Sequence, residues 1–214
     1  VRMWDYLAAQ RVDNFIADSN FVGKRIQKFY RRHADTIYPG IVVTNDPVSE
    51  ERDDFYLVVS RFVSYKRVDL AIKACNQLGR RLWVVGSGGE EEERLRGMAG
   101  PSIEFVGRIS DDEMRSYYHR AKAFLFPGIE DFGLTPLEAQ EGGTPVIAYG
   151  EGGALETVVD GKTGFFFHEQ TAEALITCLK HFEREGVEFT HHQIHDASLK
   201  FSEDAFKNNM CRSI

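Results

Sequence analysis

The sequence predicts a doubly wound α/β domain, in which helices cover both faces of a parallel sheet. Short apolar runs alternate with helical segments between residues 55 and 185. The runs are almost continuously apolar and do not alternate with polar residues, as 55–60 (FYLVVS) illustrates. Strands that are buried on both faces have this pattern. Ligands of such sheets bind beyond the carboxyl ends of the strands, so a site is expected in the loops that follow them.

The expected elements follow one another in a regular order. The first helix of the domain covers 66–78 and ends at Gly79, a residue type that commonly terminates helices. Another helix begins after Ser110, which forms a capping-box pair with Glu113. The strands are expected at 55–60, 82–85, 103–106, 123–126, 146–148 and 165–167, and the remaining helices at 90–99, 135–141, 154–160 and 171–185.

The first 38 residues are organised differently. A strand is expected at 12–17 and a helix at 21–32, with Ser19 or Asn20 as its cap. One such unit cannot bury a core by itself, so it either packs on the main domain or belongs to another one. We expect residues 1–38 to be the last βα unit of an otherwise absent amino-terminal domain, 39–200 to be the main domain and 201–214 to be a tail segment.

The composition is that of an ordinary globular protein. The chain has 214 residues, of which 43% are hydrophobic and 28% charged, and a formal net charge of −7. The negative charge argues against a nucleic-acid partner. Cys75, Cys178 and Cys211 form no CxxC pair, which indicates reduced thiols and neither a disulfide framework nor a zinc site. No run approaches the roughly 20 apolar residues that span a bilayer, so we expect a cytoplasmic protein without a transmembrane segment.

The strongest candidate site follows the expected strand 123–126. Thr135 fits a helix cap, Pro136 the first helical position and Glu138 the partner in a capping box. Capping alone explains this pattern without any ligand. However, a helix start at the carboxyl end of a buried strand has free N–H groups that can bind an anion. Glu130 in the same loop, together with Glu138, could then accept hydrogen bonds from sugar hydroxyls.

A second candidate is the pair Arg61 and Lys66, which follows the first strand of the domain. Arginine offers a planar fork for phosphate and lysine a point charge. The alternative is that both are solvated surface cations. Their place at the carboxyl end of a strand favours phosphate binding.

Other patterns resemble known sites but lack an essential residue. The G-S-G-G sequence at 86–89 lies between a strand and a helix, but the dinucleotide fingerprint would need a glycine where Glu91 stands. The G-K-T sequence at 161–163 lacks the glycine of a phosphate loop, because Glu156 occupies that position. The sequence contains neither HExxH nor Asp-x-Asp, so no metal site for a diphosphate is expected.

Residues 130–138 form an E-x7-E motif within the longer stretch PGIEDFGLTPLEAQEGGTPVIAYGEGGALETVVDGKTGFFF. This stretch strongly resembles retaining family 4 glycosyltransferases of the GT-B fold, and most of all the bacterial and archaeal polysaccharide mannosyltransferases. VVSRFVSYKRVDLAI around Arg61 and EFVGRISDDEM around Gly107 extend the resemblance. The sequence departs from the family at 39–42, where Pro-Gly-Ile-Val replaces the more usual Pro-Pro-Val-Asp.

The resemblance implies two Rossmann-like domains with the active site between them, of which this chain would contain the donor-binding one. By resemblance, Arg61 and Lys66 hold the donor diphosphate, Glu130 contacts the hexose and Glu138 binds the ribose hydroxyls. The resemblance also assigns the sugar and phosphate to the amides of Phe132, Gly133, Leu134 and Thr135, and the base pocket to Gly107, Arg108 and Ile109. The family needs no metal.

The function that the resemblance implies is transfer of a hexose with retention of its anomeric configuration. GDP-mannose is the favoured donor and a UDP-sugar the second choice. The acceptor would be a sugar or a lipid-linked glycan in polysaccharide biosynthesis, bound by the amino-terminal domain at the inner membrane face. We expect this chain alone to bind donor but to transfer sugar poorly. The alternatives are a sugar-nucleotide epimerase or hydrolase of the same fold, and a non-catalytic nucleotide-sugar-binding module.

Overall fold

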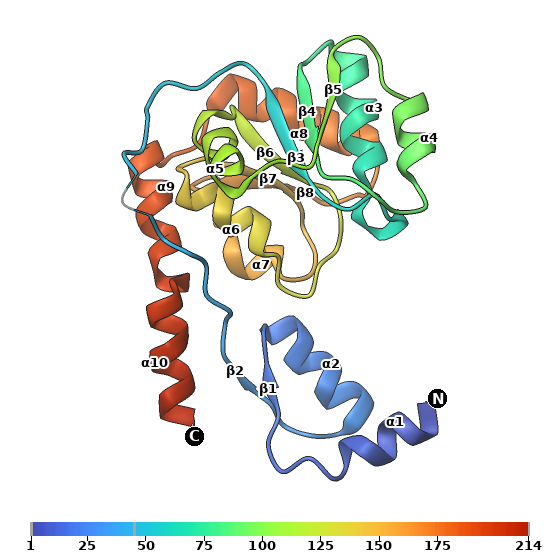
Figure 1. The fold of residues 1–214 in the computed structure, drawn as a ribbon, viewed down its shortest axis with the longest axis vertical. Coiled ribbons are helices and arrows are strands. Elements are labelled where there is room, and N and C mark those ends of the chain that lie inside the picture. The colour runs from blue at the N-terminus through green and yellow to red at the C-terminus, as the bar shows by residue number, and fades with distance from the viewer. Residues whose placement is uncertain (1, 45, 214) are drawn as a thin grey trace.

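The computed structural model describes residues 2–44 and 46–213. Within these residues, six parallel strands form one sheet in the order β5-β4-β3-β6-β7-β8 (Figure 1). The predicted α/β class with a parallel sheet is therefore confirmed. The strands are β3 (Tyr56–Val59), β4 (Leu82–Val85), β5 (Ile103–Gly107), β6 (Ala123–Phe126), β7 (Val146–Tyr149) and β8 (Gly164–Phe167).

The direction in which strands are added reverses between β3 and β6. From β3 the chain adds β4 and β5 on one side, and then returns to add β6, β7 and β8 on the other. Tyr56 and Leu57 of β3 pair with Ala123 and Phe124 of β6. Residues of the loops after these two strands, among them Lys66 and Gly128, line a small crevice at the position where open α/β sheets bind ligands.

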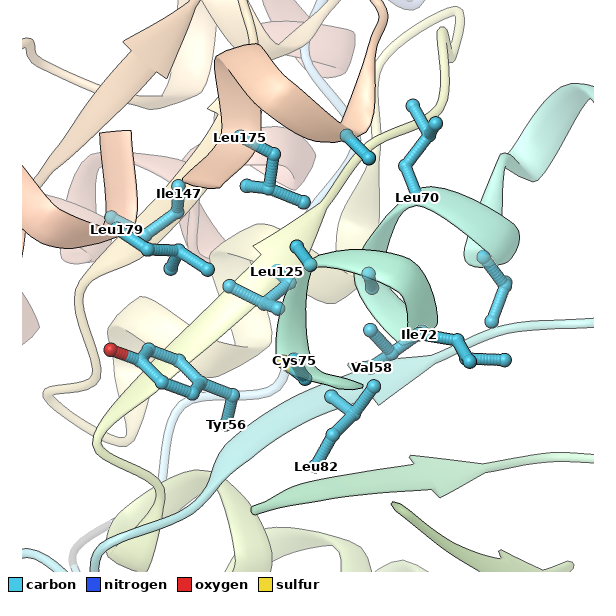
Figure 2. Packing of buried hydrophobic residues seen from close by; sticks show 14 of the residues in the cluster. Tyr56, Val58, Leu70, Ile72, Cys75, Leu82, Leu125, Ile147, Leu175 and Leu179 are labelled. Atoms are coloured by element: carbon cyan, nitrogen blue, oxygen red, sulfur yellow. The ribbon is translucent and has the colours of Figure 1, made fainter. Parts of the chain in front are cut away.

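Helices cover both faces of the sheet. One face packs against α3 (Val68–Leu78) and α8 (Ala172–Glu185), with α4 (Glu92–Gly97) next to α3. Figure 2 shows this core, in which Val58 and Leu125 of the sheet lie close to Cys75 of α3 and Leu179 of α8. The other face packs against α5 (Asp111–Arg120), α6 (Leu134–Glu141) and α7 (Ala154–Thr157). Burial on both sides is the reason that the strands are apolar, except at the edge strand β5, where Glu104 is exposed.

The helix starts agree with the sequence at α5 but not at α6. At α5 the Ser110 side chain accepts from Glu113 N–H and the Glu113 side chain accepts from Ser110 N–H, so the predicted capping box is confirmed. The capping box predicted for Thr135 and Glu138 is wrong. The chain turns into α6 earlier, at Gly133, whose φ of 92° suits glycine, and no side chain caps the helix. Pro136 is consequently the third helical residue.

Helix α7 is also shorter than expected. It ends at Thr157 and not at residue 160, because Val158 is already in extended conformation.

The amino-terminal segment contains more helix and less strand than expected. It begins with α1 (Arg2–Ala9), which the sequence reasoning did not predict. The strand expected at 12–17 is reduced to β1 (Ile16–Ala17), because its parallel partner β2 (Asp35–Thr36) offers only two residues for pairing. Between them lies α2 (Asn20–Tyr30), with Ser19 as its cap.

The carboxyl-terminal residues fold back toward the amino-terminal segment. After α9 (His191–Ser198), α10 (Glu203–Ser213) runs away from the sheet on the side of β1 and β2 (Figure 1). Ser202 bridges to Ile41 in the link between segment and sheet. The buried Phe201 ring packs against Tyr38 and Phe132, with ring centroids 5.4 and 5.8 Å away.

Candidate functional site

Lys66 and Glu130 meet where the loops after β3 and β6 come together. Lys66 ends the 3₁₀ turn Ser64–Lys66, and Glu130 follows β6 by four residues. The two loops touch at Gly128, where an added Cβ would lie 2.9 Å from the Lys66 Cα atom. This close approach brings the Lys66 ammonium into an ion pair with Glu130 Oε1. Both side chains are largely buried, with 24% and 18% exposed, so the structure joins two residues that the sequence nominated separately.

Arg61 lies in the same loop as Lys66 but is exposed. Its loop rests on the G-S-G-G segment after β4. Cβ atoms on Gly86 and Gly89 would overlap the carbonyl oxygens of Ser60 and Phe62, and Phe62 N–H donates to the Gly88 carbonyl over 2.8 Å. The G-S-G-G segment lacks the third glycine of a dinucleotide fingerprint, but it supports the loop of Arg61, the candidate for phosphate binding.

The loop that carries Glu130 is fixed from the other side by the start of α7. Gly153 N–H donates to the Glu130 carbonyl over 2.9 Å. A Cβ on Gly153 would overlap the Phe132 backbone, and one on Gly152 would lie 2.5 Å from the Glu130 carbonyl oxygen. The sequence reasoning missed these glycines as site residues. The sequence does contain a pair of glycines, Gly152 and Gly153, in the loop after β7, the strand that neighbours β6, and this pair could have indicated a close contact between loops.

Glu138 faces a small pocket between α5 and α6. The Tyr118 hydroxyl donates to Glu138 Oε2 over 2.9 Å, and burial raises the pKa of the Glu138 carboxyl above its ordinary value. The pocket has a volume of about 230 Å³ and is lined by Val42, Thr44, Asp111, Met114, Arg115, Tyr118, Glu138 and Glu141. Tyr118 is a second residue that the sequence reasoning missed, since a tyrosine inside an amphipathic helix is ordinarily part of the core.

The start of α6 leaves donors unused. Within residues 2–44 and 46–213, the N–H groups of Leu134 and Thr135 donate to no acceptor. Leu134 is exposed, whereas the Phe132 side chain is buried and stacks on Tyr38 at 5.4 Å. Phe132 can therefore offer a ligand only its backbone. A helix N-terminus with free N–H groups favours an anion.

Gly107 is the last residue of β5, and Arg108 and Ile109 follow it at the same edge of the sheet. Gly86 N–H donates to the Gly107 carbonyl over 2.9 Å, and Arg108 Nε donates to Ser87 Oγ over 2.8 Å. Ile109 packs against the hydrophobic cluster on the α5 face of the sheet. The loop after β5 thus contacts the loop after β4, which in turn supports Arg61, so Gly107 and Arg108 lie on the same edge of the sheet as Arg61.

The described residues form neither a cluster of metal ligands nor a membrane-spanning helix. In the part of the chain that the structure describes, no three side chains among histidine, cysteine, aspartate and glutamate gather as a metal site would require. Among the same residues, no helix combines the length and the apolar content that crossing a bilayer requires.

Solved structures share this architecture. A sucrose-phosphate synthase from Thermosynechococcus elongatus superimposes with a TM-score of 0.85 at 24% identity, covering 99% of this chain and 60% of that one. The Anabaena protein HepE, solved in complex with UDP and glucose, gives a TM-score of 0.81 at 19% identity and covers 97% and 64%. At these identities the similarity establishes the fold, an α/β architecture with a parallel sheet.

Sequence relatives point in the same direction. A glycogen synthase of Xanthomonas campestris pv. campestris (strain 8004) is 34% identical over 140 residues, which are 61% of this chain and 29% of that protein. A glycogen synthase of Xanthomonas axonopodis pv. citri (strain 306) is 29% identical over 186 residues, or 83% and 37%. The chain therefore spans about a third of the length of these relatives, whose names do not single out mannosyltransferases. The family described as glycosyl transferases group 1 matches residues 44–199, and the chain belongs to this family.

Proposed function

We propose that this chain binds a nucleoside diphosphate sugar across the crevice between the loops after β3 and β6, and forms the donor-binding part of a retaining hexosyltransferase. The observation that carries the proposal is the Lys66–Glu130 ion pair, which lies largely buried at the point where the strand order reverses. A cation and a carboxylate at this point match the two ends of such a donor, a diphosphate and a sugar with hydroxyl groups.

The proposed chemistry is the departure of a charged leaving group. As the glycosidic bond breaks, negative charge grows on the diphosphate. The Lys66 ammonium, the exposed Arg61 guanidinium and the free N–H groups of Leu134 and Thr135 are suited to stabilise that charge. A diphosphate would compete with Glu130 for Lys66, which would free the Glu130 carboxylate to accept hydrogen bonds from the hexose. With these groups in place, we propose that transfer needs no metal.

The nucleoside end would lie toward Glu138 and the loop after β5. Glu138 could accept from ribose hydroxyls in the pocket between α5 and α6, where Tyr118 holds its carboxylate. Gly107, Arg108 and Ile109 would border the base. GDP-mannose remains our predicted donor, and the relatives named glycogen synthase and the similar structure with UDP and glucose make a UDP-sugar or another glucose donor its direct competitor.

The acceptor would be bound outside this chain. We propose that a sugar or lipid-linked glycan reaches the crevice from an amino-terminal domain, at the inner membrane face, and that polysaccharide is the product. The chain alone would then bind donor and transfer sugar slowly.

Isothermal titration of the chain with GDP, UDP, ADP and NAD, without metal, tests the donor site. We expect GDP or UDP to bind preferentially, and Arg61→Ala and Glu138→Ala to weaken that binding. Lys24→Ala, on the exposed side of α2, is the matched control for loss of a surface cation. Preferred binding of NAD or ADP would contradict a GDP or UDP donor.

The Glu130→Ala variant separates an enzyme from a binding module. In a protein that contains both domains, we expect this variant to lose sugar transfer and to keep most of its nucleotide affinity, because Glu130 is assigned to the hexose. Unchanged transfer by the variant would refute the assignment. Donor hydrolysis without an acceptor requirement would favour a hydrolase of the same fold.

A further inference from the structure

One carboxylate joins the amino-terminal segment to the main domain. Glu156 of α7 lies opposite the first turn of α2 (Figure 1). Its Oε1 accepts from Phe21 N–H over 2.9 Å, and its Oε2 accepts from Asn20 N–H over 2.9 Å and from Asn20 Nδ2 over 2.8 Å. The Tyr38 hydroxyl also donates to Oε2, over 2.9 Å. A single side chain of the main domain thus accepts hydrogen bonds from the start of α2 and from the carboxyl end of the segment.

These bonds complete the cap of α2. The first four N–H groups of a helix have no partner inside it. Here the Ser19 side chain accepts from Val22 N–H over 3.1 Å, and the Ser19 carbonyl accepts from Gly23 N–H over 2.9 Å. The remaining two, on Asn20 and Phe21, both donate to Glu156. A negative charge at a helix N-terminus is also favourable, so α2 depends on α7 for the caps of Asn20 and Phe21, whereas the Ser19 side chain caps only Val22.

The same elements enclose the loop that carries Glu130. On one side, the start of α7 binds the Glu130 carbonyl through Gly153 N–H over 2.9 Å. On the other side, Asp131 forms an ion pair with Arg25 of α2, and the Phe132 ring stacks on Tyr38 with 18° between the ring planes. Residues 130–132 therefore lie between the α7 start and the docked amino-terminal segment.

We propose that Glu156 is a positioning residue for the sugar end of the site. By capping α2 it keeps the amino-terminal segment docked, and the docked segment holds residues 130–132 so that Glu130 remains beside Lys66. The assignment of a hexose to Glu130 rests on the proposed function. The coupling between α2 and the Glu130 loop does not, because it follows from contacts within the chain.

Hydrogen exchange in the chain itself tests the coupling without any ligand. Glu156→Gln retains the shape of the side chain but replaces the charged acceptor, so we expect the amides of residues 20–21 and also that of Gly153, which donates to the Glu130 carbonyl, to exchange about tenfold faster. Glu169→Gln, on an exposed glutamate, is the matched control. Faster exchange confined to residues 19–23 would overturn the proposal, because Glu156 would then act only as a local cap.

Charge reversal at the Arg25–Asp131 ion pair provides a second test, which leaves the hydrophobic core unchanged. Arg25 and Asp131 are about half exposed, with 52% and 55% of their side chains accessible, so reversing either charge leaves packing intact. Arg25→Glu and Asp131→Arg should each accelerate exchange of the Gly153 amide, which donates to the Glu130 carbonyl, about three- to tenfold, and the double variant should restore its protection. Arg184→Glu on α8 is the control. Failure of the double variant to restore protection would contradict the coupling.

A binding comparison tests the role in sugar placement. Glu156→Gln should weaken the binding of the preferred nucleotide-sugar about three- to tenfold and leave that of the matching nucleotide unchanged, because only the sugar meets Glu130. Equal affinities for wild type and variant, or an equal loss for both ligands, would overturn the positioning role. If the wild-type chain bound no nucleotide, the proposed function would fail, and the exchange experiments would still decide the coupling.

Discussion

Single side chains set the charge of the candidate site. Arg61 is exposed, whereas Lys66 and Glu130 are largely buried and neutralise each other. Apart from Lys66, Glu130 Oε1 has no hydrogen-bond partner among the described residues. A buried charge that loses its partner is costly, because neither water nor another group replaces the lost interaction. The two side chains should therefore be energetically coupled before any ligand binds.

The first prediction concerns this coupling. Lys66→Met should lower the free energy of unfolding by about 1–3 kcal/mol, because it leaves the Glu130 carboxylate without its partner. Adding Glu130→Gln should recover part of the loss, since an amide carries no charge. Urea denaturation of the two single variants and the double variant measures the effect. Additive losses would show that the two side chains do not interact.

The second prediction concerns pH. Burial is the main cause that raises the Glu138 pKa above its ordinary value of 4.5, and the hydrogen bond from Tyr118 partly opposes it. Because the folded state holds this proton more tightly than the unfolded state, Glu138 stabilises the fold fully below pH 4.5, and this contribution is lost as pH rises through the raised pKa. Comparing urea denaturation of wild type and Glu138→Gln from pH 4 upward should show the wild type losing relative stability. A constant difference between them would contradict the prediction.

At the scale of elements, the site is formed by loops that approach one another at glycines. The loops after β3, β6 and β7 are too close for side chains at Gly128 and Gly153. The helices and strands around them are ordinary for their sequences, and the close contacts between loops place Lys66 next to Glu130. Replacing one of these glycines should therefore affect the site more than the fold.

Gly153→Ala tests this idea. The added Cβ would overlap the Phe132 backbone, so residues 130–132 must shift. We expect a loss of roughly 1–3 kcal/mol in the free energy of unfolding. Gly97→Ala in α4 is the matched control, since its Cβ meets nothing within 4 Å and the helix should gain slightly from alanine. Equal behaviour of the two variants would refute the close-packing argument.

At the scale of the whole molecule, one aromatic cluster joins three distant parts of the chain. Tyr38 belongs to the link from the amino-terminal segment, Phe132 to the Glu130 loop, and Phe201 to the turn before α10. Phe132 and Phe201 are each 3% exposed, so the cluster is a real core although it lies away from the sheet. The amino-terminal segment, the site and α10 should therefore loosen together.

Phe201→Ala should lower the free energy of unfolding by about 3–4 kcal/mol and increase hydrogen exchange of the Gly153 amide, which donates to the Glu130 carbonyl, as well as in α10. Phe29→Ala is the matched control, because 59% of that residue is exposed and its loss should have little effect. If exchange increased in α10 alone, the cluster would not transmit the disturbance to the site.

Local patterns in the sequence determined the strands of the sheet, most of its helices and the identity of the candidate residues. Continuous apolar runs reveal strands covered on both faces, and the cap at Ser110 marks a helix start, because both depend on neighbours in sequence. The same local rules predicted a capping box between Thr135 and Glu138. In the structure the helix begins after Gly133, and the Glu138 carboxylate accepts a hydrogen bond from the Tyr118 hydroxyl. Local patterns also left α1 and the length of β1 undetected.

Only the tertiary structure decided how the parts meet. The pairing of Lys66 with Glu130, the support of Arg61 by the loop after β4 and the capping of α2 by Glu156 join residues far apart in sequence. From the sequence, Glu156 was notable only because it occupies the position where a phosphate loop requires glycine. Its four hydrogen-bond donors lie 118 to 136 positions earlier in the chain. No periodicity or spacing encodes such contacts, because they arise when the folded sheet brings separate loops to one edge.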